Sequence, residues 1–92
     1  MKPIRVLILD DESTLRTALF RLLDRKGYQV VTAQKIEEAR SFMSPDKPFD
    51  LAIIDMNLPD GNGIDFISEL KKASPAKQVL VLTGFASIDT AG

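Results

Sequence analysis

The chain contains no cysteine and no histidine. The absence of cysteine excludes disulfide bonds and thiolate metal sites, and the absence of histidine excludes the usual imidazole base and zinc ligand. Any chemistry must therefore use carboxylates, hydroxyls, lysines and the backbone.

The chain also lacks an excess of charge and a long apolar segment. Its 12 Lys and Arg nearly balance its 13 Asp and Glu, so there is no basic surface for nucleic acid. The apolar run Ile4–Leu9 has only 6 residues, too few for a secretion signal or a membrane span. We therefore expect a cytoplasmic protein that binds neither nucleic acid directly nor a membrane. At 92 residues it should form one domain with a modest core.

Two apolar runs end in acidic residues. Leu51–Ile54 is typical of a strand covered on both faces of a parallel sheet, and Asp55 follows it directly. Turn-forming residues at Pro59–Gly63 come next, so Asp55 should lie where the chain leaves the sheet. The earlier run Ile4–Leu9 is likewise followed by acids, Asp10–Glu12. We interpret Asp60–Gly63 as turn chemistry, with no catalytic role.

Segments with helical periodicity separate the strands. An amphipathic helix is predicted over Ser13–Lys26, capped by Ser13 or Thr14 and ended by Gly27. Its apolar stripe consists of Leu15, Ala18, Leu19, Leu22 and Leu23. Shorter helices are predicted over Ile36–Met43 and Ile64–Ala73, and further strands over Tyr28–Ala33, as an edge strand, and Val79–Leu82. The order βαβαβαβ predicts an α/β fold with a parallel sheet and right-handed crossovers.

This topology suggests a metal site. If the strand order is 2-1-3-4, then Asp10, Asp11 and Asp55 meet at the carboxyl edge of the sheet, with the hydroxyl of Thr83 at the same edge. Carboxylates this close either raise one another's pKa or hold a cation, for which Mg²⁺ is the natural choice. The simpler alternative is that Asp10–Glu12 are acids favoured at the start of a helix.

Three motifs resemble those of a known family. LILDDE (Leu7–Glu12), IIDMNLPDGNG (Ile53–Gly63) and LTGFAS (Leu82–Ser87) occur in order, each at the end of a strand. Together they resemble the response-regulator receiver domains of two-component signalling, and the resemblance extends from Ile4 to Ala91. It implies a flavodoxin-like, doubly wound parallel sheet with strand order 2-1-3-4.

The resemblance also implies a phosphorylation site. Asp55 is similar to the aspartate that accepts a phosphoryl group from a histidine kinase or phosphotransfer protein, which would be the partner of this chain. Asp10 and Asp11 resemble the pair that holds Mg²⁺ together with Asp55 and the backbone carbonyl of Asn57.

Further roles follow from the same resemblance. Thr83 would be the switch hydroxyl that turns toward the phosphoryl oxygens, while Asn57 and Phe85 would tune the lifetime of the acyl phosphate. A domain of this kind is a signalling switch rather than an enzyme that turns over an external substrate.

The chain departs from the family at its C-terminus. Such receivers continue through a fifth strand with a Lys-Pro pair and a fifth helix, whereas this chain stops at Gly92, after the start of a fourth helix at Ser87–Ala91. We therefore expect residues 1–92 to be a truncated receiver domain with no catalytic lysine, attached to an unknown output domain. On this interpretation every lysine lies far from the acidic edge: Lys2, Lys26, Lys35, Lys47, Lys71, Lys72 and Lys77.

Other motifs fit less well. An EF-hand loop starting at Asp55 would need Gly and Glu where the chain has Asp60 and Phe66. Gly61 to Gly63 lacks the third glycine of a dinucleotide-binding loop. A haloacid-dehalogenase phosphatase, the enzyme alternative, would need an aspartate in place of Asn57.

A second hypothesis is a truncated module that mainly self-associates. Val79–Leu82 is apolar throughout, yet without a fifth strand it would lie at the edge of the sheet. We expect a homodimer or larger assembly, either through pairing at this edge or through exchange of Thr83–Gly92.

Overall fold

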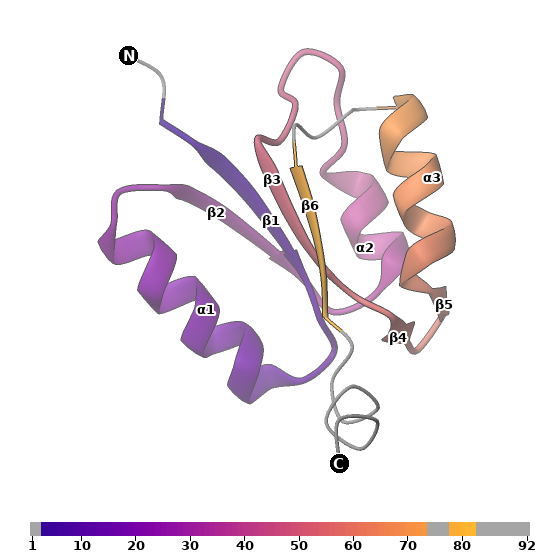
Figure 1. The fold of residues 1–92 in the computed structure, drawn as a ribbon, viewed down its shortest axis with the longest axis horizontal. Helices are drawn as coiled ribbons and strands as arrows, with labels where there is room; N and C mark the ends of the chain where they lie inside the picture. Colours follow the sequence, from indigo (N-terminus) through magenta and orange to yellow (C-terminus); the bar gives the residue numbers. More distant parts are fainter. Residues whose placement is uncertain (1–2, 74–77, 83–92) are drawn as a thin grey trace.

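A four-stranded parallel sheet forms the centre of the molecule. The structure is a computed structural model that describes residues 3–73 and 78–82. The strands are β1 (Arg5–Leu9), β2 (Gln29–Ala33), β3 (Leu51–Asp55) and β6 (Gln78–Leu82), in the order β2-β1-β3-β6 (Figure 1). Since β6 is the fourth strand of this sheet along the chain, the predicted parallel sheet and its 2-1-3-4 order are confirmed.

A small antiparallel hairpin follows the third strand. It pairs β4 (Asn57–Leu58) with β5 (Gly61–Asn62), opposing Asn57 to Asn62 and Leu58 to Gly61. The sequence analysis predicted a turn here but not this pairing.

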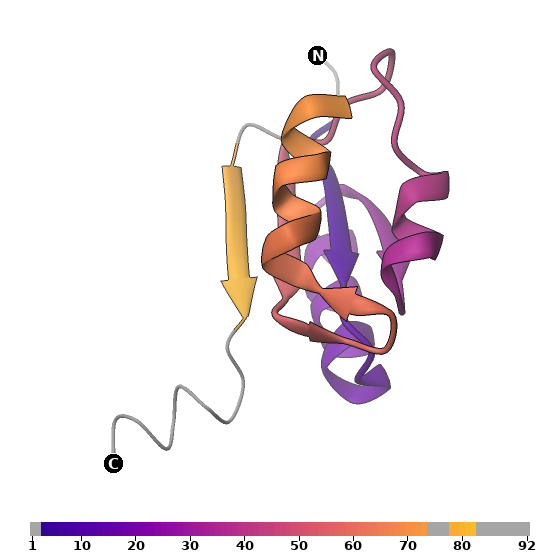
Figure 2. The same ribbon diagram turned by 90° about the vertical axis from the view of Figure 1, so that its right-hand side faces the viewer.

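Helices cover both faces of the sheet. Figure 1 shows α1 (Ser13–Arg25) on one side, and α2 (Ile36–Ser41) with α3 (Gly63–Ala73) on the other. Figure 2, turned by 90°, shows α3 in front of the sheet with α2 beside it. The fold is therefore α/β and doubly wound, as predicted.

Two groups of apolar side chains form the core. The larger lies between the sheet and the α2–α3 layer and includes the fully buried Phe49, Phe66 and Leu70. The smaller lies beneath α1, where Val6, Ile8 and Ile53 contact the half-buried Leu19 and Leu23. Successive residues of a strand point to opposite faces, so β1 contributes to both groups.

The predicted packing of α1 needs correction. No residue of this helix is buried, and Leu22 of the apolar stripe is 54% exposed. The stripe is wider than the contact that α1 makes with the sheet, so Leu19 and Leu23 reach the core while Leu15, Ala18 and Leu22 are exposed.

The ends of the helices also differ from prediction. The N-cap of α1 is Glu12, without a side-chain capping bond, rather than Ser13 or Thr14. Gly27 does end this segment, with a φ of +91°. The second helix ends at Ser41 instead of Met43, and the third begins at Gly63 instead of Ile64. Its buried face is formed by Gly63, Phe66 and Leu70, while Ile64 is exposed.

Within residues 3–73 and 78–82, no helix is both long enough and apolar enough to cross a membrane.

Candidate metal centre

Three carboxylates meet at the carboxyl edge of the sheet. Leu9 of β1 pairs with Ile54 of β3, so the residues that follow them, Asp10 and Asp55, leave the sheet side by side. Oxygen atoms of Asp10, Asp11 and Asp55 all lie within 4.8 Å of one another. The sequence-based expectation that these three residues come together is therefore met by the fold.

Asp10 is the most deeply placed of the three, with only 2% of its surface exposed. Its carboxylate Oδ1 accepts a hydrogen bond of 2.9 Å from the backbone amide of Glu12. Its backbone carbonyl accepts another, also of 2.9 Å, from the guanidinium of Arg16, and its amide donates to the carbonyl of Ala33 at 3.0 Å. These bonds fix both the backbone and the carboxylate of Asp10.

Asp55 is half-buried, and its surroundings disfavour its ionised form. Burial raises the pKa of its carboxyl group, the hydrogen bond from the amide of Asn57 opposes this, and the neighbouring Asp10 and Asp11 raise the pKa further. The Asn57 amide lies 3.2 Å from Oδ1. A carboxylate held among like charges gains from a cation, because the cation removes the repulsion.

Glycine is required where the hairpin returns to the sheet. The amide of Gly63 donates to the carbonyl of Met56 at 2.8 Å, and a Cβ atom at Gly63 would lie 1.9 Å from the backbone oxygen of Asp55. A residue with a side chain could not occupy this position without moving the backbone that presents Asp55.

The donor set suits a hard divalent cation. Three carboxylates from two adjacent strand ends supply only oxygen ligands, which Mg²⁺ and Ca²⁺ prefer. The fourth proposed ligand is the backbone carbonyl of Asn57. Asn57 is exposed and lies two residues beyond Asp55, at the start of the hairpin. The residues present therefore fit Mg²⁺.

The prediction that every lysine lies far from the acidic edge is wrong for Lys35. Together with Asp11, Gln34, Glu38 and Pro59, Lys35 lines an open cleft of about 470 Å³. Lys35 lies in the loop that follows β2. Because the carboxyl ends of parallel strands lie at the same edge of the sheet, this loop is at the same edge as Asp10 and Asp55.

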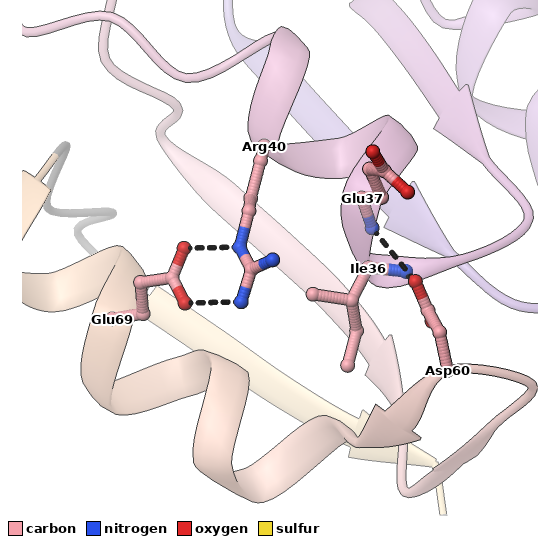
Figure 3. A network of polar contacts seen from close by, with 5 residues as sticks. All are labelled: Ile36, Glu37, Arg40, Asp60 and Glu69. Atoms are coloured by element: carbon pink, nitrogen blue, oxygen red, sulfur yellow. Dashed lines mark hydrogen bonds and ion pairs between the residues drawn. The ribbon is translucent and has the colours of Figure 1, made fainter.

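Sequence reasoning also missed the role of Asp60. This residue was interpreted as part of a turn, but its carboxylate accepts hydrogen bonds from the backbone amides of Ile36 and Glu37, at 2.8 and 3.0 Å (Figure 3). These bonds lower the pKa of Asp60. The N-cap of α2 is Lys35, which provides no side-chain acceptor, but this lysine does not identify Asp60 as the residue that supplies one.

Two predicted residues, Thr83 and Phe85, lie outside the described residues, as does the expected start of a fourth helix at Ser87–Ala91.

A doubly wound parallel sheet with an acidic cluster at its carboxyl edge defines a class of α/β proteins that bind ligands at this edge. Within that class, residues 6–92 match the family model described as the response regulator receiver domain. The chain belongs to this family, as its motifs predicted. Receiver domains are signalling domains rather than enzymes that turn over an external substrate.

Named relatives agree with this membership. The chain is 37% identical over 87 residues to the response regulator protein PilR of Pseudomonas aeruginosa, covering 95% of this chain and 19% of PilR. It is 31% identical over 86 residues to the photosynthetic apparatus regulatory protein RegA of Rhodobacter capsulatus, covering 94% of this chain and 46% of RegA. The chain thus spans less than half the length of each of these relatives.

Solved structures give the same result. The non-phosphorylated HemR receiver domain from Leptospira biflexa superposes with a TM-score of 0.78 at 31% identity, covering 98% of this chain and 74% of the receiver-domain chain. A response regulator from Burkholderia pseudomallei, with a phosphorylated aspartic acid, a calcium ion and citrate, gives a TM-score of 0.80 at 34% identity. The match covers 96% of this chain and 51% of the chain of that regulator.

Proposed function

We propose that this chain accepts a phosphoryl group on Asp55, in a Mg²⁺-dependent reaction, from the phosphohistidine of a histidine kinase or phosphotransfer protein. The observation that carries this proposal is the cluster of Asp10, Asp11 and Asp55, whose oxygens lie within 4.8 Å of one another. The phosphorylated aspartate of the Burkholderia pseudomallei regulator supports it. We place the reaction in the cytoplasm and regard the modification as a signalling switch.

The proposed transfer exchanges one bond for another. A carboxylate oxygen of Asp55 forms a bond to phosphorus as the bond from phosphorus to the donor's imidazole nitrogen breaks. The electron pair of the broken bond stays on that nitrogen, and the donor leaves as neutral histidine when its other nitrogen carries a proton. The product is an acyl phosphate on Asp55.

Different residues of the chain would hold Mg²⁺ and orient the carboxylates during this transfer. Asp10, Asp11, Asp55 and the backbone carbonyl of Asn57 would hold Mg²⁺, which supplies positive charge opposite the phosphoryl oxygens when it is bound. The Asn57 amide fixes one oxygen of Asp55 through its 3.2 Å hydrogen bond. The bonds to Asp10 hold that carboxylate in its buried position, so little reorganisation is needed on binding.

The roles of three other positions remain part of the proposal. Thr83 follows Leu82, which pairs with Asp55 across β6 and β3, and this adjacency supports its assignment as the switch hydroxyl. Asn57 and Phe85 are proposed to tune the lifetime of the acyl phosphate.

Phosphorylation with a small donor tests the main proposal. Incubation with acetyl phosphate and MgCl₂, followed by intact-mass measurement, should show one phosphoryl group on the wild type and none on Asp55→Ala. Asp46→Asn is the matched control, because Asp46 is an exposed acid in the loop before β3, at the opposite edge of the sheet. Modification that persists in Asp55→Ala, or that does not depend on Mg²⁺, would contradict the proposal.

A second proposal concerns assembly. Within residues 3–73 and 78–82, β6 pairs only with β3, and its residue Leu80 is 53% exposed. We propose that this edge pairs with a second copy of the chain, since an open strand edge with apolar side chains favours such pairing. Light scattering over a dilution series should show a dimer or larger species that Leu80→Lys weakens. A monomer at every concentration would overturn this proposal.

A further inference from the structure

The hairpin beside the metal centre is tied to a helix that is distant in sequence. Asp60, in the turn of the β4–β5 hairpin, accepts hydrogen bonds from the amides of Ile36 and Glu37, 24 and 23 residues earlier. Figure 3 shows the Asp60 carboxylate directed at the start of α2. These amides are otherwise unpaired at a helix N-terminus, so one carboxylate satisfies two donors at once.

The hairpin also fits closely against the same helix. A Cβ atom at Gly61 would lie 2.8 Å from Cδ1 of Ile36, a side chain that belongs to the larger core group. At its other end, the hairpin returns through Gly63, which touches the backbone of Asp55. The segment that contains Asn57 is thus held at two points, by Asp55 on one side and by α2 on the other.

Helix α2 has no side-chain capping bond from its own N-cap residue, Lys35, and it has only six residues. A short helix gains stability from capping and packing rather than from its own length. The acceptor that α2 lacks locally is supplied by Asp60, three residues beyond Asn57.

We propose that Asp60 is a positioning residue for the metal centre: by binding the N-terminus of α2, it fixes the hairpin and hence the backbone carbonyl of Asn57 relative to Asp10, Asp11 and Asp55. This inference rests on the proposed Mg²⁺-dependent function. It also makes α2 a reporter of the metal centre, because a coupling between two sites is reciprocal. If the hydrogen bonds of Asp60 favour Mg²⁺ binding, then Mg²⁺ must favour those hydrogen bonds by the same factor.

Two variants separate geometry from charge. Asp60→Ala removes the acceptor, and Asp60→Glu keeps the negative charge but places it on a longer side chain. Both should weaken Mg²⁺ binding in calorimetric titrations, Asp60→Ala by about fivefold or more, the lower range of measured couplings. If only the charge of Asp60 mattered, Asp60→Glu would bind Mg²⁺ as tightly as the wild type, and this result would contradict the inference.

Glu69→Ala is the matched control. Glu69 forms an ion pair with Arg40, so this change removes one link between α2 and α3 without touching the hairpin (Figure 3). We expect it to leave the dissociation constant of Mg²⁺ unchanged. An equal loss of affinity in Glu69→Ala would show that general loosening of α2, rather than Asp60, is responsible.

Amide hydrogen exchange gives a readout that is independent of activity and of variant stability. In the wild type, saturating Mg²⁺ should slow exchange of the Ile36 and Glu37 amides. The factor of slowing should be about equal to the factor by which Asp60→Ala weakens Mg²⁺ binding. If Asp60→Ala does not fold, this wild-type measurement decides alone. Wild-type binding of Mg²⁺ without any change at these two amides overturns the inference and leaves the proposed function intact. Failure of the wild type to bind Mg²⁺ overturns both.

Discussion

Gly63 and Asp55 are in backbone contact: a Cβ atom at position 63 would lie 1.9 Å from the carbonyl oxygen of Asp55 and 2.9 Å from its carbonyl carbon. Both of these Asp55 atoms belong to the backbone, so they cannot rotate away as a flexible side chain could. The tight return of the hairpin and the presentation of Asp55 therefore depend on the same glycine.

Gly63→Ala should disturb both stability and the metal centre. We expect the free energy of unfolding in urea to fall by about 3 kcal/mol, the upper end for overpacked sites, together with weaker Mg²⁺ binding. Gly27→Ala is the contrasting control: nothing lies within 4 Å of its Cβ position, but its φ of +91° strains alanine. That variant should lose about 1–2 kcal/mol from backbone strain alone and keep its Mg²⁺ affinity.

Replacing Asp55 by asparagine should stabilise the metal-free protein at neutral pH. Burial and the charges of Asp10 and Asp11 raise the pKa of Asp55, so folding favours its protonated form. This contribution to stability is present at acid pH and is lost as the pH rises through the pKa of the folded state. The advantage of Asp55→Asn should therefore grow from acid to neutral pH and shrink when Mg²⁺ stabilises the wild type.

Urea denaturation at several pH values, without Mg²⁺, measures this difference. Asp46→Asn serves as the control, since Asp46 is an exposed acid at the opposite edge of the sheet. Equal or lower stability of Asp55→Asn at neutral pH would show that the repulsion among the three carboxylates is already relieved.

The strands and the acidic cluster could be predicted from sequence because each follows from local patterns. An apolar run followed by an acid marks the end of a buried strand, and both Asp10 and Asp55 are placed by that rule. The order of the strands came from resemblance, because apolar runs alone do not specify which strands are neighbours.

Contacts between distant segments could not be predicted in this way. Asp60 caps a helix 24 residues earlier, and no local pattern marks that pairing. Lys35 was placed wrongly because loop residues were judged by type rather than by the strand they follow. The exposed Leu22 of α1 shows a further limit, since periodicity gives the direction of an apolar stripe but not how much of it is covered.

The ion pair between α2 and α3 should contribute little to stability. The guanidinium of Arg40 donates two hydrogen bonds to the carboxylate of Glu69, at 2.6 and 2.9 Å, but the side chains are 53% and 38% exposed (Figure 3). A double-mutant cycle with Arg40→Ala and Glu69→Ala should give a small coupling that decreases as the salt concentration rises.

The pH dependence of this coupling has a defined sign. The hydrogen bond from Arg40 and the charge of Arg40 lower the pKa of Glu69. The ion pair therefore contributes to stability at pH values above the pKa that Glu69 has in the unfolded chain. The coupling should disappear as the pH falls through the lower pKa of the folded state. A coupling that is independent of both salt and pH would indicate packing between the two side chains rather than charge.

Lys35 should affect Mg²⁺ binding and phosphorylation in opposite directions. Lys35 is exposed and lines the same cleft as Asp11, one of the three carboxylates. Its positive charge opposes a cation at the metal centre but attracts an anionic phosphoryl donor to the same edge. Lys35→Ala should therefore bind Mg²⁺ slightly more tightly and yet react more slowly with acetyl phosphate, each by about two- to fivefold at low salt, as expected for an exposed charge.

Calorimetry with MgCl₂ and the rate of modification by acetyl phosphate at saturating Mg²⁺ measure the two effects separately. The hydrogen bonds that cap α2 should survive the change, because the Lys35 side chain makes no capping bond and only its charge acts on Asp60. Lys71→Ala is the matched control, an exposed lysine in the last turn of α3, and it should alter neither quantity. Because the interaction of Lys35 is between exposed charges, both effects should fade as ionic strength shortens the Debye length. Changes of the same sign in the two measurements would instead mean that Lys35→Ala distorts the metal centre.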